Sequence, residues 1–225
     1  MYIMLTREQA EKFAIDYQTS TDNILKEHYQ LYLLDLLYSS SIANNLIFKG
    51  GTAIKLVYNS FRFSEDLDFS LVVQTDYEKF KKIILRVKKI LPESVIKEIY
   101  NKKNTFFAKI NFQIDFKPIP IGIKIEINKE IKKGETAIKL IKSPFNNIEA
   151  IGNVFTLREI LKKKLALLDL RREPRDLFDA WYLKEKIGEK LEIKDKHRYS
   201  HIELMNGLNS FLPINKRQVI KLFEK

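Results

Sequence analysis

The segment FKGGTAIKLVYNSFRFSEDLDFSLVV, residues 48–73, carries the strongest fold signal in the sequence. It starts with the end of a short apolar run that predicts a strand, and Gly50 and Gly51 follow directly. Residues 52–58 predict a short helix, and every odd-numbered position of residues 66–73 is apolar, as in a strand with one buried face. A glycine turn between a strand and a helix lets the N–H groups of the helix N-terminus approach a phosphate.

Asp66 and Asp68 lie two residues apart in the second strand of this segment, so both side chains point to one face, about 7 Å apart along the backbone. Two carboxylates this close repel each other unless a cation bridges them. Mg²⁺ is the natural partner, because it takes oxygen ligands and keeps waters for substrate phosphates. A D-x-D pair alone is often a solvated strand end, and a glycosyltransferase interpretation leaves the Gly-Gly turn unexplained. The whole segment therefore predicts a phosphate-binding turn beside a metal site.

These residues resemble the polymerase-β type nucleotidyltransferases, and more closely the toxin branch called the AbiEii family. That branch begins with F-K-G-G-T and ends with R-x-S-x-D-x-D, here residues 48–52 and 62–68. The resemblance extends over residues 22–186. It implies an α+β fold, with a polymerase-β-like core (a mixed sheet with flanking helices) followed by a C-terminal helical region.

The resemblance also implies a function. Such a protein transfers NMP from an NTP substrate to an acceptor, here RNA and in particular the 3′ end of tRNA, with Mg²⁺, or Mn²⁺ in its place, as the cofactor. Many members are the toxin of a toxin–antitoxin or phage-defence pair, which implies a cognate antitoxin protein as a partner. An alternative in another class is a degenerate nucleic-acid-binding module that keeps the fold without the chemistry.

Several site residues follow from the resemblance. The Gly-Gly turn and the Thr52 hydroxyl are expected to cradle the β- and γ-phosphates. A third carboxylate on a neighbouring strand is expected to join Asp66 and Asp68 in holding two Mg²⁺ ions. Glu126 fits the family's K-x-[DE]-I pattern, and Asp115, beside a turn, is the alternative. The implied nucleotide-binding residues in this part of the chain are Lys49, Gly50, Gly51, Thr52, Arg62 and Ser64.

The second informative segment is TLREILKKKLALLDLRREPRDLFDAWYL, residues 156–183. At helical spacing, Lys164 falls in the middle of an apolar stripe, and Arg171 joins its edge. A lysine in this position must find an anion or extend its stem over the domain edge. The AbiEii-type pattern K-x-x-A-L-x-x-R-x-x-x-R-D-x-F-D runs from Lys164 to Asp179 and departs at Leu167, where the family has alanine. The resemblance therefore assigns Lys164 and Arg171 to the nucleotide triphosphate.

Asp176 is a secondary catalytic candidate, because the family's Arg-Asp pair borders the active cleft. A structural alternative is an ion pair or a charge at a helix N-terminus, and Arg175 with Asp179 could form an i,i+4 pair. The catalytic candidates are Asp66, Asp68, Glu126, Lys164 and Asp176.

The rest of the chain predicts the frame around these segments. Residues 22–38 predict a buried helix capped by Asp22, and Thr75-x-x-Glu78 predicts the capping box of another. Three strands are expected at residues 94–100, 105–116 and 121–128. The Pro-, Asn- and Gly-rich stretch SPFNNIEAIGN (143–153) is the best boundary, with only helices expected after it. The predicted domains are a nucleotidyltransferase core with N-terminal helices at 1–145 and a C-terminal helical domain at 146–225.

Composition narrows the class of protein. The 225 residues include 40 Lys+Arg, 29 Asp+Glu and no cysteine, which excludes disulfides, thiolate zinc sites and cysteine nucleophiles. The net charge of +11 favours a polyanionic partner, although solvated lysine-rich helix faces are the plainer explanation. No apolar stretch approaches a membrane span and the first residues lack a signal-peptide pattern, so we expect a cytoplasmic protein without membrane contact.

Overall fold

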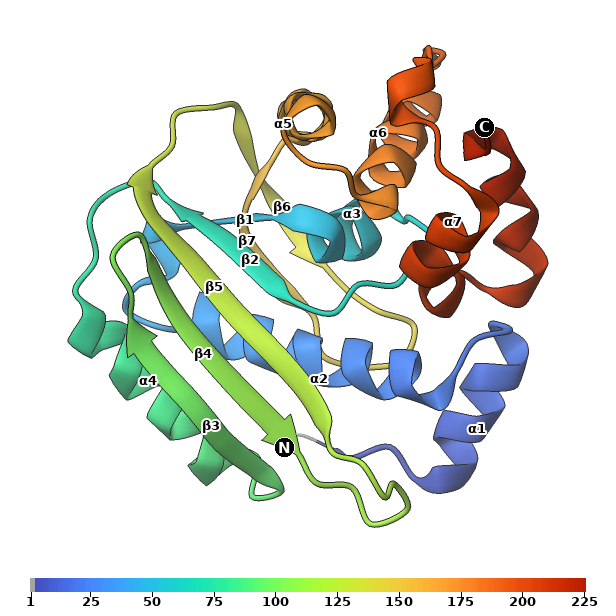
Figure 1. Ribbon diagram of the computed structural model, residues 1–225. Helices are drawn as coiled ribbons and strands as arrows, with labels where there is room; N and C mark the ends of the chain where they lie inside the picture. Colours follow the sequence, from blue (N-terminus) through green and yellow to red (C-terminus); the bar gives the residue numbers. More distant parts are fainter. Residues whose placement is uncertain (1–2) are drawn as a thin grey trace.

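A computed structural model describes residues 3–225 (Figure 1). Its strands are β1 (Leu46–Lys49), β2 (Leu67–Leu71), β3 (Ser94–Asn101), β4 (Thr105–Phe112), β5 (Ile121–Ile131), β6 (Thr136–Ile141) and β7 (Ala150–Phe155). Its α-helices are α1 (Arg7–Asp16), α2 (Thr21–Tyr38), α3 (Gly50–Tyr58), α4 (Tyr77–Ile90), α5 (Leu157–Leu170), α6 (Pro174–Lys186) and α7 (His201–Leu208). A 3₁₀ segment, Ile214–Phe223, follows α7 near the C-terminus.

All seven strands form one mixed sheet in the order β3-β4-β5-β2-β1-β7-β6. The β1–β7 and β2–β5 pairs are parallel, and the other neighbouring pairs are antiparallel. The strand–glycine–helix–strand unit predicted from residues 48–73 is present as β1, α3 and β2. A mixed sheet with flanking helices, followed by C-terminal helices, confirms the predicted fold class.

The helices cover the two faces of the sheet unequally (Figure 1). Helices α2 and α4 lie behind the sheet, whereas α3 packs against the other face at β1 and β2, and α5 and α6 lie on the same side as α3. Helix α2 is buried along most of its length, and its Tyr29 ring stacks on Phe112 of β4 with centroids 4.0 Å apart. No helix lies in front of β3, β4 and β5 in this view.

Two predicted helix caps are wrong by one or two residues. The side chain of Ser20, not Asp22, caps α2 by accepting from the Asn23 N–H at 3.2 Å. Helix α4 is capped by Asp76, because the Thr75 hydroxyl instead accepts a hydrogen bond from an asparagine in the loop before β1. By contrast, the predicted cap at Thr156 of α5 is confirmed.

The stretch 143–153, expected to be a boundary with only helices after it, instead contains the start of a strand. Strand β7 lies within residues 150–155 and pairs with β1 in the interior of the sheet, with Phe48 opposite Val154. Strand β6, which precedes the expected boundary, was also missed, and it forms the edge of the sheet beside β7. The helical part therefore begins at α5, and the division of the chain at residue 145 stays a prediction.

Candidate functional site

Strand pairing brings two of the predicted carboxylates together. In the parallel β2–β5 ladder, Asp68 lies directly opposite Glu126. Asp66 immediately precedes β2, on the same face as Asp68. Asp115 lies exposed in the turn between β4 and β5, away from this position. Of the two alternatives for the third carboxylate, the structure places Glu126 beside Asp68.

These carboxylates line a polar cavity of about 290 Å³. The lining comes from the α3 N-terminus, the β2 strand with its preceding loop, β5, α5 and the start of α6. The cavity therefore brings together residues from both segments that the sequence singled out. Its lining residues are Gly51, Arg62, Ser64, Glu65, Asp66, Asp68, Glu126, Lys164, Arg171, Glu173, Arg175 and Asp176.

The two glycines allow an unusually close approach between α3 and the carboxylate strand. Gly50 has φ +82°, and a β-carbon there would lie 2.3 Å from Asp68 Oδ2. A β-carbon at Gly51 would lie 2.5 Å from Arg62 Nη2 and 2.7 Å from Ser64 Oγ. Side chains at these positions would fill the space between the helix N-terminus and the acidic side chains. Because the first N–H groups of a helix have no intrahelical partner, this end of α3 presents donors to an anion.

Two predicted nucleotide-binding residues, Thr52 and Lys49, have other contacts. The Thr52 side chain is buried, and its hydroxyl donates to the Asp66 carbonyl at 2.5 Å. The Thr52 hydroxyl therefore ties α3 to the start of β2, and only its backbone N–H is oriented with the helix N-terminus. Lys49 ends β1 opposite Asp68, and burial, followed by the like charges of Lys163 and Lys132, holds its pKa below the usual value against the attraction of Asp68.

Burial also shifts the acidic side chains toward protonation. Burial, with smaller increases from Asp66 and Glu126, raises the pKa of Asp68 to about 6 against the attraction of Lys49 and Lys164. The pKa of Asp66 is raised as well, mainly by burial, and Lys124 opposes this shift with its Nζ 3.8 Å from Asp66 Oδ2. An acidic group that resists ionisation in the free protein is stabilised when a cation binds beside it.

A buried chain of ion pairs connects the loop before β2 to helices α5 and α6. Arg62 donates Nε to Asp179 Oδ1 and Nη2 to Oδ2, both at 2.9 Å. Lys164 Nζ lies 2.7 Å from Asp179 Oδ2 and 2.7 Å from Asp176 Oδ1. Arg171 Nε completes the chain at 2.6 Å from Asp176 Oδ2. Three cations meet two carboxylates here, so the network carries excess positive charge toward the cavity.

The network decides between the alternatives that the sequence left open. Lys164 is only 9% exposed and forms ion pairs with Asp176 and Asp179, so its side chain does not lie over a domain edge. Asp176 does form ion pairs. Burial would raise its pKa, but the hydrogen bonds and positive charges of Arg171 and Lys164 together hold this pKa below its usual value. The suggested Arg175–Asp179 pair is replaced, since Arg175 lies 3.9 Å from Glu65.

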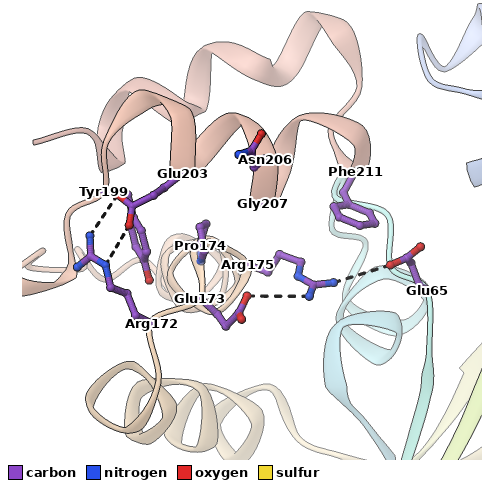
Figure 2. A pocket seen from close by; sticks show the side chains of 10 residues that line it. All are labelled: Glu65, Arg172, Glu173, Pro174, Arg175, Tyr199, Glu203, Asn206, Gly207 and Phe211. Carbon is purple, nitrogen blue, oxygen red and sulfur yellow. Dashed lines mark hydrogen bonds and ion pairs between the residues drawn. The ribbon is translucent and has the colours of Figure 1, made fainter.

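A second cavity, of about 440 Å³, adjoins the first (Figure 2). Glu65, Glu173 and Arg175 line both cavities, and Figure 2 shows the Arg175 guanidinium between the two glutamates. Its outer wall comes from α7 and the residues after it, where the Arg175 guanidinium lies 5.3 Å from the Phe211 ring centroid. A ligand with an anionic end and a flat ring system could therefore extend from one cavity into the other.

The donor chemistry of the first cavity fits a hard divalent cation. Asp68 and Glu126 lie side by side, Asp66 lines the same cavity, and burial disfavours the ionised form of both aspartates. Within residues 3–225 no three acidic or histidine side chains converge closely enough to form a metal site as they stand. The cavity therefore fits a divalent cation by its oxygen ligands and by the strands that carry them. The Asp66 carboxylate is turned toward Lys124.

Sequence reasoning missed three residues of this region. Asp179 holds both Arg62 and Lys164, and it was matched to the family pattern without being given a role. Glu65 and Glu173 line both cavities and went unassigned. For Glu65, its position directly before Asp66 could have indicated a place in the site. Glu173 becomes part of the site only through the packing of α6.

The Gly-Gly turn and the D-x-D strand of this mixed sheet meet in one polar cavity beneath two helices. This arrangement is typical of a nucleotidyltransferase-type protein. Residues 32–205 match the family model described as "Nucleotidyl transferase AbiEii toxin, Type IV TA system". The chain belongs to the AbiEii family of nucleotidyltransferase toxins. Among curated proteins, none matches the chain.

Solved structures support the fold. The nucleotidyltransferase toxin MenT4 from Mycobacterium tuberculosis superposes with a TM-score of 0.63 at 18% identity, covering 97% of this chain and 88% of that one. JHP933 from Helicobacter pylori gives 0.56 at 22% identity, covering 74% and 68%. At such identities the likeness shows the fold alone. In residues 3–225, no helix combines the length and hydropathy needed to cross a membrane.

Proposed function

We propose that this protein transfers a nucleoside monophosphate from an NTP to RNA, with the 3′ end of tRNA as the acceptor. The observation that carries the proposal is the contact between the Gly50 turn and Asp68, with Glu126 in register on the next strand. This contact supports the proposal because the N–H groups of a helix N-terminus can bind an anion and the neighbouring carboxylates can bind a cation. Phosphoryl transfer requires these two properties together, since the reacting group is an anion that a cation must neutralise.

In this proposal the triphosphate lies between the α3 N-terminus and the ion-pair network. The N–H groups of α3 bind the β- and γ-phosphates, and Arg171, the most exposed cation of the network, meets the triphosphate first. Lys164 neutralises charge that develops during transfer. Arg62 is enclosed by Asp179 and the Phe63 carbonyl, so we assign it a positioning role rather than direct contact. The nucleoside extends into the second cavity, beside Arg175.

Asp66, Asp68 and Glu126 would hold Mg²⁺, or Mn²⁺ in its place. When bound, the metal supplies charge neutralisation for the phosphates and acidifies the attacking hydroxyl. In the covalent step the acceptor hydroxyl oxygen bonds to the α-phosphorus, and the bond from the α-phosphorus to the oxygen bridging to the β-phosphorus breaks. Pyrophosphate leaves, and the hydroxyl proton passes to the Glu126 carboxylate.

The choice of RNA as the acceptor rests on charge and family. A net charge of +11 favours a polyanion, and the family is one of toxins, which act on a component that cells need. We further propose that the protein acts in the cytoplasm, where tRNA is available, and that a cognate antitoxin restrains it.

The test is incubation with each of the four NTPs, labelled at the α-phosphate, together with Mg²⁺ and total cellular RNA. We expect label in a tRNA-sized band with wild-type protein and none with Asp68→Asn. Asp35→Asn is the matched control, because Asp35 lies on α2, on the opposite side of the sheet, and should transfer at the wild-type rate.

Each of the other possible outcomes would change a different part of the proposal. Label that persists with Asp68→Asn would remove the carboxylates from the chemistry. NTP binding without labelled RNA would move the acceptor to a protein or small molecule. Neither binding nor transfer would favour a nucleic-acid-binding module that keeps the fold alone.

A further inference from the structure

One face of the sheet remains open beside the proposed active site. Strands β4 and β5 bury every second side chain against α2 and α4, and the alternate positions point away from these helices. Figure 1 shows no helix in front of this part of the sheet. The open face of β3, β4 and β5 carries Tyr100, Thr105, Phe107, Lys109, Asn111, Lys124, Glu126 and Asn128.

The strand register links this open face directly to the catalytic carboxylates. Glu126 of β5 lies opposite Phe107 of β4, and Phe107 lies opposite Tyr100 of β3. At about 4.8 Å between strands, Tyr100 lies roughly 10 Å from Glu126 and roughly 15 Å from Asp68. A linear ligand bound across these strands would thus bring one of its ends to the carboxylates.

Tyr100 gives the face an aromatic surface. Its side chain is 51% exposed at the edge strand, and its ring stacks on Phe107 with centroids 6.3 Å apart and planes 15° apart. Lys102 Nζ lies 3.8 Å from the Phe107 centroid, on a loop beside the pair. A half-exposed ring held flat by a second ring is a suitable support for a nucleobase.

Cations accompany the aromatic pair. Lys109 lies opposite Lys124 in the β4–β5 ladder, two residues along β4 from Phe107 and on the same face of the strand. Lysines beside an aromatic ring are the combination that binds single-stranded nucleic acid, because the ring stacks on a base while the cations contact phosphates. An acidic protein bound to this face could pair with the lysines, but it would offer no base to stack on the exposed ring.

We propose that this open face binds the single-stranded 3′ end of the acceptor RNA, with a base stacked on Tyr100 and phosphates at Lys109 and Lys102. The assignment rests on the proposed function for the identity of the acceptor. It places the RNA on the β5 side of the carboxylates and leaves the α5–α6 side to the NTP. The two substrates therefore approach Asp68 and Glu126 from opposite sides.

Binding can be measured without chemistry, in EDTA and without NTP, by fluorescence anisotropy of an eight-nucleotide RNA labelled at its 5′ end. We expect Tyr100→Ala to weaken binding by roughly 5- to 150-fold, the range for loss of one base stack, and Tyr100→Phe to retain it. Lys109→Glu should weaken binding and reduce its salt dependence. The thermal midpoints of all variants are measured first, and exposure of Tyr100 predicts little change.

Matched controls lie elsewhere on the molecule. Tyr17→Ala removes a 41% exposed ring next to α1, and Lys82→Glu makes the same charge change on α4, behind the sheet. Equal losses in the controls, or no loss in the Tyr100 and Lys109 variants, would overturn the proposal. So would a wild-type protein that fails to bind the oligonucleotide at low salt.

Transfer assays separate this proposal from the proposed function. If wild-type protein labels RNA and Tyr100→Ala does so with an unchanged KM for RNA, the open face is overturned while the transfer activity stands. If no RNA is labelled but binding depends on Tyr100, the open face is a nucleic-acid-binding surface and the acceptor assignment fails.

Discussion

Lys164 Nζ lies 2.7 Å from Asp176 Oδ1, and this pair fixes α5 against α6 at the wall of the carboxylate cavity. Asp176 and Asp179 both pair with this lysine, so in the proposed function a triphosphate would compete with two aspartates for it. A buried lysine held in this way is preorganised for charge that develops during transfer and needs no reorganisation at that moment.

Replacing Lys164 tests this role. We expect Lys164→Met to lower kcat for nucleotide transfer by roughly 100-fold, the cost of losing one preorganised charge contact. Lys162→Met on the exposed side of the same helix is the control and should retain wild-type kcat. Steady-state rates at saturating Mg²⁺ and NTP give the comparison, and an equal loss in both variants would contradict the assignment.

The pH dependence of metal use follows from Asp68. Burial raises the pKa of Asp68 to about 6, so below this pH the free carboxyl holds a proton that a cation must displace. The Mg²⁺ concentration for half-maximal transfer should therefore rise as pH falls through about 6, by up to tenfold per pH unit, and level off above pH 7. Titration of activity with Mg²⁺ at pH 5, 6, 7 and 8 checks this. A constant half-maximal concentration would show that no proton competes.

The same pKa shift determines how the stability of the metal-free protein changes with pH. Because the folded-state pKa of Asp68 is raised above that of the unfolded chain, the folded state holds an extra proton between about pH 4 and 6. Its contribution to the free energy of unfolding is therefore present at low pH and declines as pH rises through about 6. In EDTA, Asp68→Asn should raise the thermal midpoint relative to wild type more at pH 8 than at pH 5. The reverse order would contradict the burial of this carboxylate.

Gly50 offers a comparison between two kinds of cost. Gly50→Ala combines positive φ with a β-carbon 2.3 Å from Asp68 Oδ2, whereas Gly188→Ala has φ +74° with no atom within 4 Å. Gly188→Ala should cost about 1 kcal/mol of unfolding free energy, the price of left-handed backbone alone. Gly50→Ala should cost more and should also abolish transfer, because the carboxylate must move. Urea denaturation and transfer assays check both, and equal costs would show that the close approach is unimportant.

Arg62 and Asp179 form a pair that is 3% and 0% exposed. Without Arg62, the buried Asp179 would keep only Lys164, which it shares with Asp176, so Arg62→Met should cost about 3–5 kcal/mol of unfolding free energy. The exposed pair of Arg7 with Glu11 is the control, and Arg7→Met should change stability by no more than about 0.5 kcal/mol. Urea denaturation measures both. A cost for Arg62→Met close to that of the control would show that the network is dispensable.

Local sequence signals predicted the centre of the fold well. The strand, the glycine pair, the short helix and the D-x-D strand are contiguous in sequence, and each has its own periodicity or turn residue. The family pattern added Glu126 and Lys164, and the structure brings both to the same cavity as Asp68.

The missed features depend on contacts between distant parts of the chain. Gly152 was read as a turn signal, but a β-carbon there would lie 2.3 Å from the Tyr38 ring, so this glycine makes room for α2 within a strand. Likewise, Arg62, one of the two partners of Asp179, comes from a loop more than 100 residues earlier, and no local pattern indicates that pairing.

The position of strand β7 late in the chain also affects when the proposed site can assemble during synthesis. Its pairing with β1 joins residues 46–49 to residues 150–155, and Lys164 and Asp176 follow later still. A nascent chain that has just released the Gly50 turn and both aspartates still lacks the strand beside β1 and the helices that complete the cavity. The order of the chain therefore delays assembly of the proposed site until most of the polypeptide has left the ribosome.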